Sequence, residues 1–269
     1  MPQPLSPNVG VPSPGWEKAY WAAPGDDARF NLESRAVLDH PEDSQRYGTS
    51  LLTARAARRR ALGADLLGQL ASVKPSAQIV DLLVSRLEQE RNPVPLSSLV
   101  VACGHARAAS GRRQIADLVR HPDSKVRFAV AWALPLVGLD RHGIRALVAL
   151  SCDRERQVRD WATFGLAESS SRARITIGAL RARSADRDRD TRAEAIWGLA
   201  RRRDVTASPL VELELLRDDV GELVQRAQKE LQSSPQSRGA RKRTDFRSSI
   251  QGTRGASTRI AGSRRNAGV

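Results

Sequence analysis

Three segments in the middle of the chain repeat one pattern of apolar and polar positions. They are residues 126–134, 158–166 and 191–199, which align without gaps at spacings of 32 and 33 residues. In each segment an arginine stands second, an aromatic residue seventh, a small residue eighth and a leucine ninth. Apolar residues recur three or four positions apart, which predicts a helix with one buried stripe. A fixed period of this length is typical of repeat proteins.

Weaker copies of the pattern extend the series in both directions. Residues 60–68 and 96–104 precede the strong copies and residues 223–231 follow them, so about six units result. A second amphipathic segment lies between successive copies, at residues 78–87, 113–120, 143–150, 175–181 and 210–216. Asp and Ser cluster just before the first segment of each strong unit, where their side chains can cap a helix. Each unit is therefore predicted to be a pair of helices.

Composition agrees with an all-α chain. Of the 269 residues 40% are hydrophobic but only 4% are aromatic, and Ala and Leu are abundant, which favours closely packed helices over a β-sandwich. We predict a right-handed α-solenoid over residues 51–232. Residues 1–50, rich in Pro and Gly, and residues 233–269, rich in Gly, Ser and Arg, are predicted to be largely disordered. Within the repeats, Pro135 is expected to end or kink its helix early.

The net charge of +14 belongs mainly to the C-terminal tail. Residues 233–269 contain nine basic residues and one acidic residue, which gives +8 and leaves +6 for the rest of the chain. Such a tail can bind nucleic acid without sequence preference by neutralising phosphates, can bind acidic proteins, or can simply remain solvated. Charge alone therefore does not indicate a nucleic-acid-binding protein.

The sequence contains no run of 18 apolar residues, and its N-terminus is Pro-rich and uncharged. Neither a membrane span nor a secretory signal is predicted, so we expect a cytoplasmic protein with no membrane partner. Cys103 and Cys152 lie in apolar helical stretches without metal-ligand spacing. Both are predicted to be buried as small apolar residues.

The repeated motif Asp/Glu-x-x-Val-Arg-x-x-Ala-x-x-Ala/Gly-Leu resembles the HEAT-like repeats of bacterial proteins, in the short form also found in phycobilisome lyases. The resemblance covers residues 53–231 and is strong over residues 121–200. It implies an α-solenoid with an extended surface, which most such families use to bind protein partners. The signatures of tetratricopeptide and ankyrin repeats are absent.

The repeated arginines each follow an acidic residue by four positions. Pairing within one helix, or across neighbouring units, would form a ladder of ion pairs that sets the repeat register. The alternative is a stripe that binds anions. Recurrence in every strong unit favours the structural interpretation. The residues concerned are Arg127, Arg159 and Arg192, with Asp123, Glu155 and Asp188.

Aromatic residues supply the other candidate positions. Trp132, Phe164 and Trp197 are equivalent by register and are expected to form a ladder in the core. If they were exposed, they would form a ridge for a protein partner or a platform for nucleobases. Four further residues are candidates for exposed contacts, because they lie outside the register or in the N-terminal flank: Trp161, Asp160, Trp16 and Trp21.

Residues that could carry catalysis are scattered. No His-Glu dipeptide exists, so the paired iron ligands of deoxyhypusine hydroxylase, a HEAT-repeat enzyme, are missing. DNA glycosylases built of HEAT-like repeats use aromatic residues and a carboxylate, which Trp161 and Asp160 match only in residue type. No cofactor, metal or small-molecule substrate is predicted.

The sequence thus predicts a non-enzymatic scaffold that binds a protein partner along the solenoid surface. Two alternatives remain open. One is a nucleic-acid-binding or DNA-repair protein that uses a basic surface and the arginine-rich tail. The other is a lyase- or oxidoreductase-type relative of the HEAT-repeat enzymes.

Overall fold

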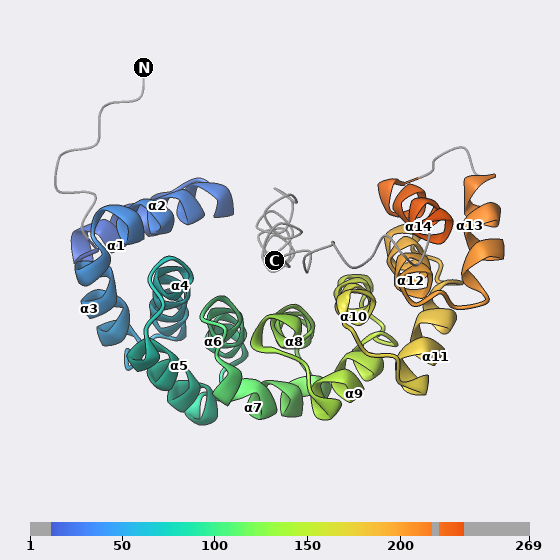
Figure 1. Cartoon of the computed structure of the whole chain (residues 1–269). Coiled ribbons are helices and arrows are strands. Elements are labelled where there is room, and N and C mark those ends of the chain that lie inside the picture. The colour runs from blue at the N-terminus through green and yellow to red at the C-terminus, as the bar shows by residue number, and fades with distance from the viewer. Residues whose placement is uncertain (1–11, 217–220, 234–269) are drawn as a thin grey trace, which may run out of the picture. The chain divides into compact units, whose positions relative to one another are not determined.

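The computed structural model describes residues 12–216 and 221–233. These residues form fourteen α-helices and two short 3-10 helices, and no strand occurs in this part of the chain (Figure 1). The prediction of an all-α fold is confirmed. None of the described helices is long and apolar enough to cross a membrane.

The described chain divides into two compact units, residues 12–114 and residues 115–233. The first unit contains α1 (Pro14–Ala22), α2 (Asp26–Asp39), α3 (Pro41–Leu51), α4 (Ala57–Val73), α5 (Ala77–Gln89), α6 (Pro93–His105) and the 3-10 helix Ala109–Gly111. Helix α7 (Arg112–Asp117) spans the boundary. The second unit contains the 3-10 helix Leu118–Arg120, α8 (Ser124–Val137), α9 (Arg141–Leu150), α10 (Arg156–Glu168), α11 (Arg174–Arg183), α12 (Arg189–Arg202), α13 (Ala207–Leu215) and α14 (Glu222–Gln232).

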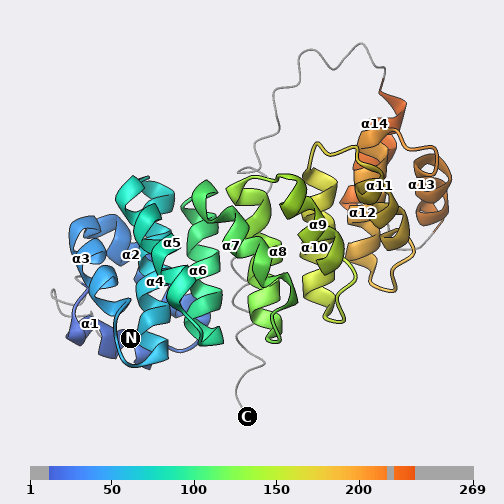
Figure 2. The same ribbon diagram turned by 90° about the horizontal axis from the view of Figure 1, so that it is seen from below.

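Within the second unit the helices form two layers. Helices α8, α10, α12 and α14 pack side by side in chain order, and α9, α11 and α13 pack behind them (Figures 1 and 2). The first unit repeats the arrangement, because α4 packs against α6 and α5 packs against both. The strong motif copies lie on α8, α10 and α12, and the second amphipathic segments lie on the helices behind. The predicted helix pairs are therefore present.

The N-terminal flank is helical where the sequence predicted disorder. Residues 14–51 form α1, α2 and α3, and both α2 and α3 pack against α4. Trp16 and Tyr20 stand four residues apart on α1, so they share one face and are both buried. The error arose because Pro and Gly were taken as signs of disorder, whereas Pro14 occupies the first turn of a helix capped by Ser13. Residues 1–11 and 234–269 lie outside the described part.

Pro135 does not end its helix early, as the sequence had suggested. Helix α8 continues to Val137, and Gly138 ends it with a φ of 90°. The proline lies in the last turn, where it removes only one backbone hydrogen bond. Its ring instead packs on α10, because a Cβ added at Gly165 would lie 2.8 Å from the Pro135 Cγ.

Small residues allow neighbouring helices to approach closely. A Cβ added at Gly198 on α12 would lie 2.9 Å from both the Cα and the Cβ of Ala167 on α10. A Cβ added at Gly68 on α4 would lie 2.7 Å from the Cα of Ala102 on α6. At Gly198, the eighth position of its motif copy, a small residue is thus required by the backbone of the preceding motif helix, α10.

Two glycine substitutions test this packing. Gly198→Ala should lower the free energy of unfolding by about 1–3 kcal/mol, because the added methyl meets backbone that cannot move aside. Gly178→Ala on α11 should raise it by about 0.5–1 kcal/mol, because a Cβ there meets nothing within 4 Å and alanine favours the helix. Urea denaturation of the two variants measures both values. Equal effects of the two substitutions would refute the close approach of α10 and α12.

Candidate functional site

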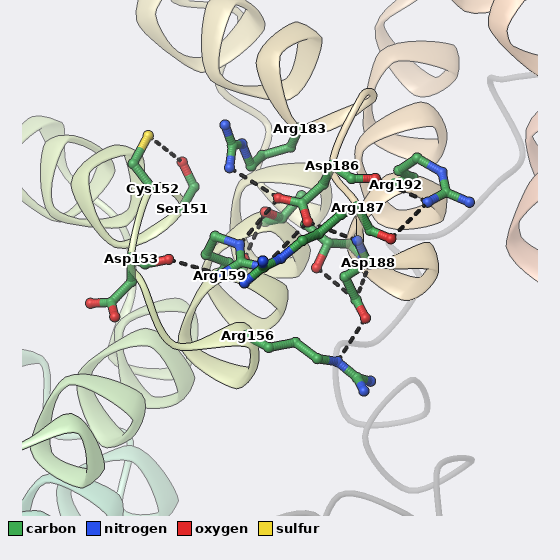
Figure 3. A network of polar contacts seen from close by, with 12 residues as sticks. Ser151, Cys152, Asp153, Arg156, Arg159, Arg183, Asp186, Arg187, Asp188 and Arg192 are labelled. Carbon is green, nitrogen blue, oxygen red and sulfur yellow. Dashed lines mark hydrogen bonds and ion pairs between the residues drawn. The ribbon is translucent and has the colours of Figure 1, made fainter.

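The repeated arginine joins the turn before its own helix to the turn before the next motif helix. In Arg159, Nη1 donates to the carbonyl oxygens of Asp153 and Arg154, at 3.0 Å each. Nε and Nη2 donate to the two carboxylate oxygens of Asp186, at 3.1 and 3.3 Å (Figure 3). The Arg159 and Asp186 side chains are only 7% and 4% exposed. Four donors of one guanidinium are therefore satisfied in the protein interior.

The same geometry recurs at Arg127 and, with one change, at Arg192. Arg127 binds both carboxylate oxygens of Asp153, at 2.6 and 3.0 Å, and the carbonyl oxygens five and six residues before it at 2.9 Å. Arg192 binds the corresponding carbonyls, but its carboxylate is Glu214 on α13, at 3.1 Å. Arg127 thus reaches an acidic residue of the following unit, as Arg159 does, whereas Arg192 reaches one on the second helix of its own unit.

Arg60 belongs to the same set, although the sequence did not single it out. It binds Glu90 at 2.7 and 3.1 Å and the carbonyl oxygens of Ala54 and Arg55 at 3.0 Å. Arg60 follows the N-cap Ala56 by four residues, as Arg127 follows Asp123. The motif copy at residues 60–68 must therefore shift by one position. We call Arg60, Arg127, Arg159 and Arg192 the ladder arginines.

The predicted acidic partners have other roles. Asp123 and Asp188 are N-caps that accept a backbone N–H with their own side chains, and Asp188 also pairs with the exposed Arg156 at 2.7 Å. Glu155 starts α10 without a side-chain cap, and its carboxylate lies 3.7 Å from Arg154. Pairing within one helix is thus corrected: Arg127 and Arg159 pair across neighbouring units, and Arg192 pairs with the second helix of its own unit.

Asp153 and Asp186, which bind Arg127 and Arg159, also accept backbone hydrogen bonds within their own turns. Oδ1 of Asp186 accepts the backbone N–H of Asp188 at 2.9 Å, and Oδ1 of Asp153 accepts that of Glu155 at the same distance. Burial alone would raise the pKa of Asp186, but the Asp188 N–H and the Arg159 guanidinium outweigh it and lower the pKa below 3.8. The pKa of Asp153 is lowered likewise, where burial is outweighed chiefly by Arg127. Both carboxylates are therefore ionised at neutral pH.

Three residues predicted to be exposed contacts are buried: Trp161 and Asp160 on α10, and Trp16 on α1. Trp161 is 7% exposed, and its ring meets Phe128 and Phe164 edge to face, with centroids 6.2 and 5.5 Å away. It lies one turn after the buried Val158, on the packed side of α10. Its charged neighbours suggested exposure, but Arg159 is a buried ladder arginine. Asp160 is also buried.

The tryptophans of the N-terminal flank differ from each other in exposure. Trp16 is 1% exposed and stacks on Tyr20, so its prediction as an exposed contact is corrected. Trp21 is half-buried, and its Nε1 donates to Glu17 at 3.0 Å. Glu17 in turn accepts the Tyr47 hydroxyl and pairs with Arg59 of α4. This network joins α1 to α3 and α4.

The predicted aromatic ladder is buried at one end only. Trp132 is 2% exposed, whereas Phe164 and Trp197 are half-buried. Nε1 of Trp197 donates to Oε1 of Glu168 at 2.9 Å, and the Arg201 guanidinium carbon lies 5.7 Å from the ring centroid. Arg201 also pairs with Glu168 at 3.1 Å. We call Phe164, Glu168, Trp197 and Arg201 the Trp197 surface.

Three consecutive arginines at the end of α12 bind the ends of other helices. Arg201 donates to the carbonyl oxygen of Ala167, and Arg203 to that of Leu231 at the end of α14. Arg202 is 7% exposed and has no carboxylate within 4 Å among the described residues. Its guanidinium donates instead to carbonyl oxygens at and beyond the end of α10, those of Leu166, Ala167, Ser169 and Ser171.

Arg202 remains a cation despite its burial. Burial, together with repulsion by Arg201 and Arg172, lowers its pKa to about 10. The negative end of the α10 dipole and the carbonyl acceptors compensate for the missing counter-ion. Sequence reasoning missed this residue. Basic residues in the last turn of a predicted helix are the signal that could have found it.

Cysteines and metal ligands offer no further chemistry in the described residues. Burial raises the pKa of Cys103 to about 12, which fits its predicted packing role. Cys152 is exposed, which corrects the prediction that it is buried. The described residues contain no group of three His, Cys, Asp or Glu side chains that could hold a metal ion.

Several solved structures resemble this chain. YibA of Escherichia coli aligns with a TM-score of 0.63 and 18% sequence identity, over 86% of this chain and 88% of YibA. Two engineered proteins align with TM-scores of 0.55 and 0.54 at 20% identity, over 71% and 72% of this chain and 95% and 100% of their own. No protein-family model and no curated protein matches the sequence. At these identities the structures show the fold alone.

The fold is therefore that of a HEAT-like repeat protein, as the repeated motif predicted. Its ladder arginines are bound in the turns, and the half-exposed aromatic residues of the repeated motif, Phe164 and Trp197, lie on α10 and α12.

Substitution of a ladder arginine should be costly, whereas its exposed neighbour should matter little. Arg159→Ala should lower the free energy of unfolding by about 3 kcal/mol, because it leaves buried acceptors without their donor. Arg156→Ala, on an arginine with a 61% exposed side chain, should cost at most about 1 kcal/mol. Denaturant unfolding compares the two. A similar small loss in both variants would contradict the role of the ladder.

The ladder should also make stability depend on pH. Asp153 and Asp186 have lower pKa values folded than unfolded, so their contribution is full above pH 3.8 and is lost as pH falls through the folded values. The double variant Asp153→Asn/Asp186→Asn should be less stable at pH 6 and lose less stability on acidification. Unfolding free energies at several pH values test this. Parallel curves for wild type and variant would refute it.

Proposed function

We propose that this chain is a non-enzymatic repeat scaffold that binds a protein partner through the Trp197 surface. The observation that carries the proposal is the half-exposed Trp197, held in place by Glu168 and Arg201. Trp and Arg are enriched among the residues that dominate protein interfaces. A side chain that is already fixed loses little entropy on binding.

The register of the repeats supports this choice of surface. Trp132 and Trp197 occupy the same motif position, but only Trp132 is packed into the core. Four residues further on, Leu136 follows Trp132, whereas Glu168 follows Phe164 and Arg201 follows Trp197. The stripe therefore changes from apolar to mixed aromatic and charged along α8, α10 and α12. A polar rim around an aromatic centre is the usual composition of an interface.

The charges of the surface favour protein over nucleic acid. The guanidinium of Arg201 lies over the Trp197 ring and is paired with Glu168. Neither the ring nor the guanidinium is therefore fully available to a base or a phosphate. The Glu168 carboxylate would also repel a phosphate backbone.

Affinity capture with paired variants tests the proposal. The immobilised full chain should retain a defined protein partner from cell extract, and the purified partner should then bind the chain directly in calorimetry. Trp197→Ala should weaken that binding at least about tenfold, as truncation of an interface anchor does. Leu216→Ala, which truncates a side chain that is 84% exposed elsewhere, should leave it unchanged.

Thermal unfolding of both variants separates a binding loss from a folding loss. If Trp197→Ala folds normally and binds the partner like wild type, this surface is not the interface. Turnover of a small molecule by the purified chain, without any partner, would overturn the scaffold itself.

A further inference from the structure

Helices α9 and α11 are basic without any acidic residue. The α9 segment RHGIRALVAL contains two arginines, and the α11 segment RITIGALRAR contains three. The two helices pack against each other in the second unit, in the layer behind α8, α10 and α12 (Figure 1). By contrast, the next helix of that layer, α13, carries Glu212 and Glu214. Of the three helices α9, α11 and α13 in this layer, α9 and α11 are thus basic and α13 is acidic.

Three of these arginines have no structural use within the described chain. Arg181 pairs with Asp204 and Arg183 with Asp186. Arg141, Arg145 and Arg174 are exposed, and no carboxylate lies within 4 Å of their guanidinium groups among the described residues. Arg141 and Arg145 are one turn apart, so they lie on the same side of α9.

One of these arginines has an exposed apolar neighbour. Ile175 on α11 is 44% exposed, next to Arg174. One turn further on, Gly178 has no heavy atom within 4 Å of where its Cβ would stand. An apolar side chain of a partner could therefore reach the α11 backbone beside Ile175. We call Arg141, Arg145, Arg174, Ile175 and Gly178 the α9–α11 surface.

This composition favours one kind of partner. Arginine binds carboxylates and phosphates equally well in geometric terms. A nucleic-acid backbone, however, offers nothing apolar to cover Ile175, and the single aromatic ring on α9 and α11, that of His142, is held by the Asp117 carboxylate at 2.9 Å. An acidic amphipathic protein segment satisfies both features, with carboxylates on the arginines and an apolar side chain on Ile175.

We infer that the α9–α11 surface is a second docking site, which binds an acidic amphipathic segment of a protein partner. It shares with the proposed function the premise that the chain binds protein. It uses other residues, on the helix layer behind the Trp197 surface. The proposals for the two sites can therefore be refuted independently of each other.

Fluorescence anisotropy with defined probes tests this site on the full chain. The probe is a short labelled peptide of glutamate and leucine in a helical repeat, compared with polyglutamate and a DNA duplex of equal charge. Wild type should bind the glutamate–leucine peptide, more weakly as salt rises. The triple variant Arg141→Gln/Arg145→Gln/Arg174→Gln should lose at least about tenfold in affinity.

A matched control separates the site from the overall charge of the chain. Arg35→Gln/Arg154→Gln/Arg187→Gln removes three exposed arginines elsewhere. It has the same net charge as the triple variant of the α9–α11 surface. It should bind the peptide within about twofold of wild type, and so should Trp197→Ala. Ile175→Ser should weaken binding of the glutamate–leucine peptide and leave polyglutamate binding unchanged.

Three results would overturn the inference. The first is no binding of the peptide by wild type. The second is an equal loss in the two triple variants, which would assign binding to net charge. The third is tighter binding of the DNA duplex that the α9–α11 variant alone abolishes, which would assign the surface to nucleic acid. Failure of Trp197→Ala to affect the captured partner would leave the α9–α11 surface standing.

Discussion

The arrangement of the repeats depends on one interaction, the planar guanidinium of a ladder arginine bound on both sides. Nη1 takes the two carbonyl oxygens of the turn before its own helix, and the other nitrogens take a carboxylate of the next unit. A lysine could not do this, because a single ammonium group has no fork that faces two turns at once. Removal of either the arginine or the carboxylate would leave the other group buried and unpaired, which is costly. The ion pair therefore keeps the two turns in place relative to each other.

The carboxylates that bind the ladder arginines explain how one unit sets the register of the next. Asp186 binds Arg159 of the preceding helix and the N–H that begins the next one, so the same carboxylate positions both. Among the described residues, the step from α6 to α8 lacks this device. Helix α6 carries Leu96 where the others carry arginine, and His121 stands where the turn before α8 would carry the acid. The chain divides into its two units at that same step.

The sequence was sufficient for the helices of the repeats but not for the partners of their side chains. Helix pairs follow from local periodicity, and the three strong motifs fixed the register of α8, α10 and α12. The acid that binds Arg159 lies 27 residues away, whereas Glu155 lies nearby and is equally acidic, so spacing alone favoured the wrong pair. Trp161 was misjudged for the same reason, because its neighbours in sequence are charged but are themselves buried. Helices α1, α2 and α3 were missed because Pro and Gly in this flank were taken as signs of disorder, although Pro14 starts a helix.

Position within the repeat also separates structural from functional residues. Second-position arginines are committed to stacking by their hydrogen bonds, and the eighth-position Gly198 is committed to it by its close approach to the α10 backbone. Seventh-position residues are not so constrained, which is why Trp132 is buried while the equivalent Trp197 reaches the surface. The outward sides of α9 and α11 are equally free of any stacking role. Binding residues can therefore differ from unit to unit at these positions without disturbing the register that the ladder sets.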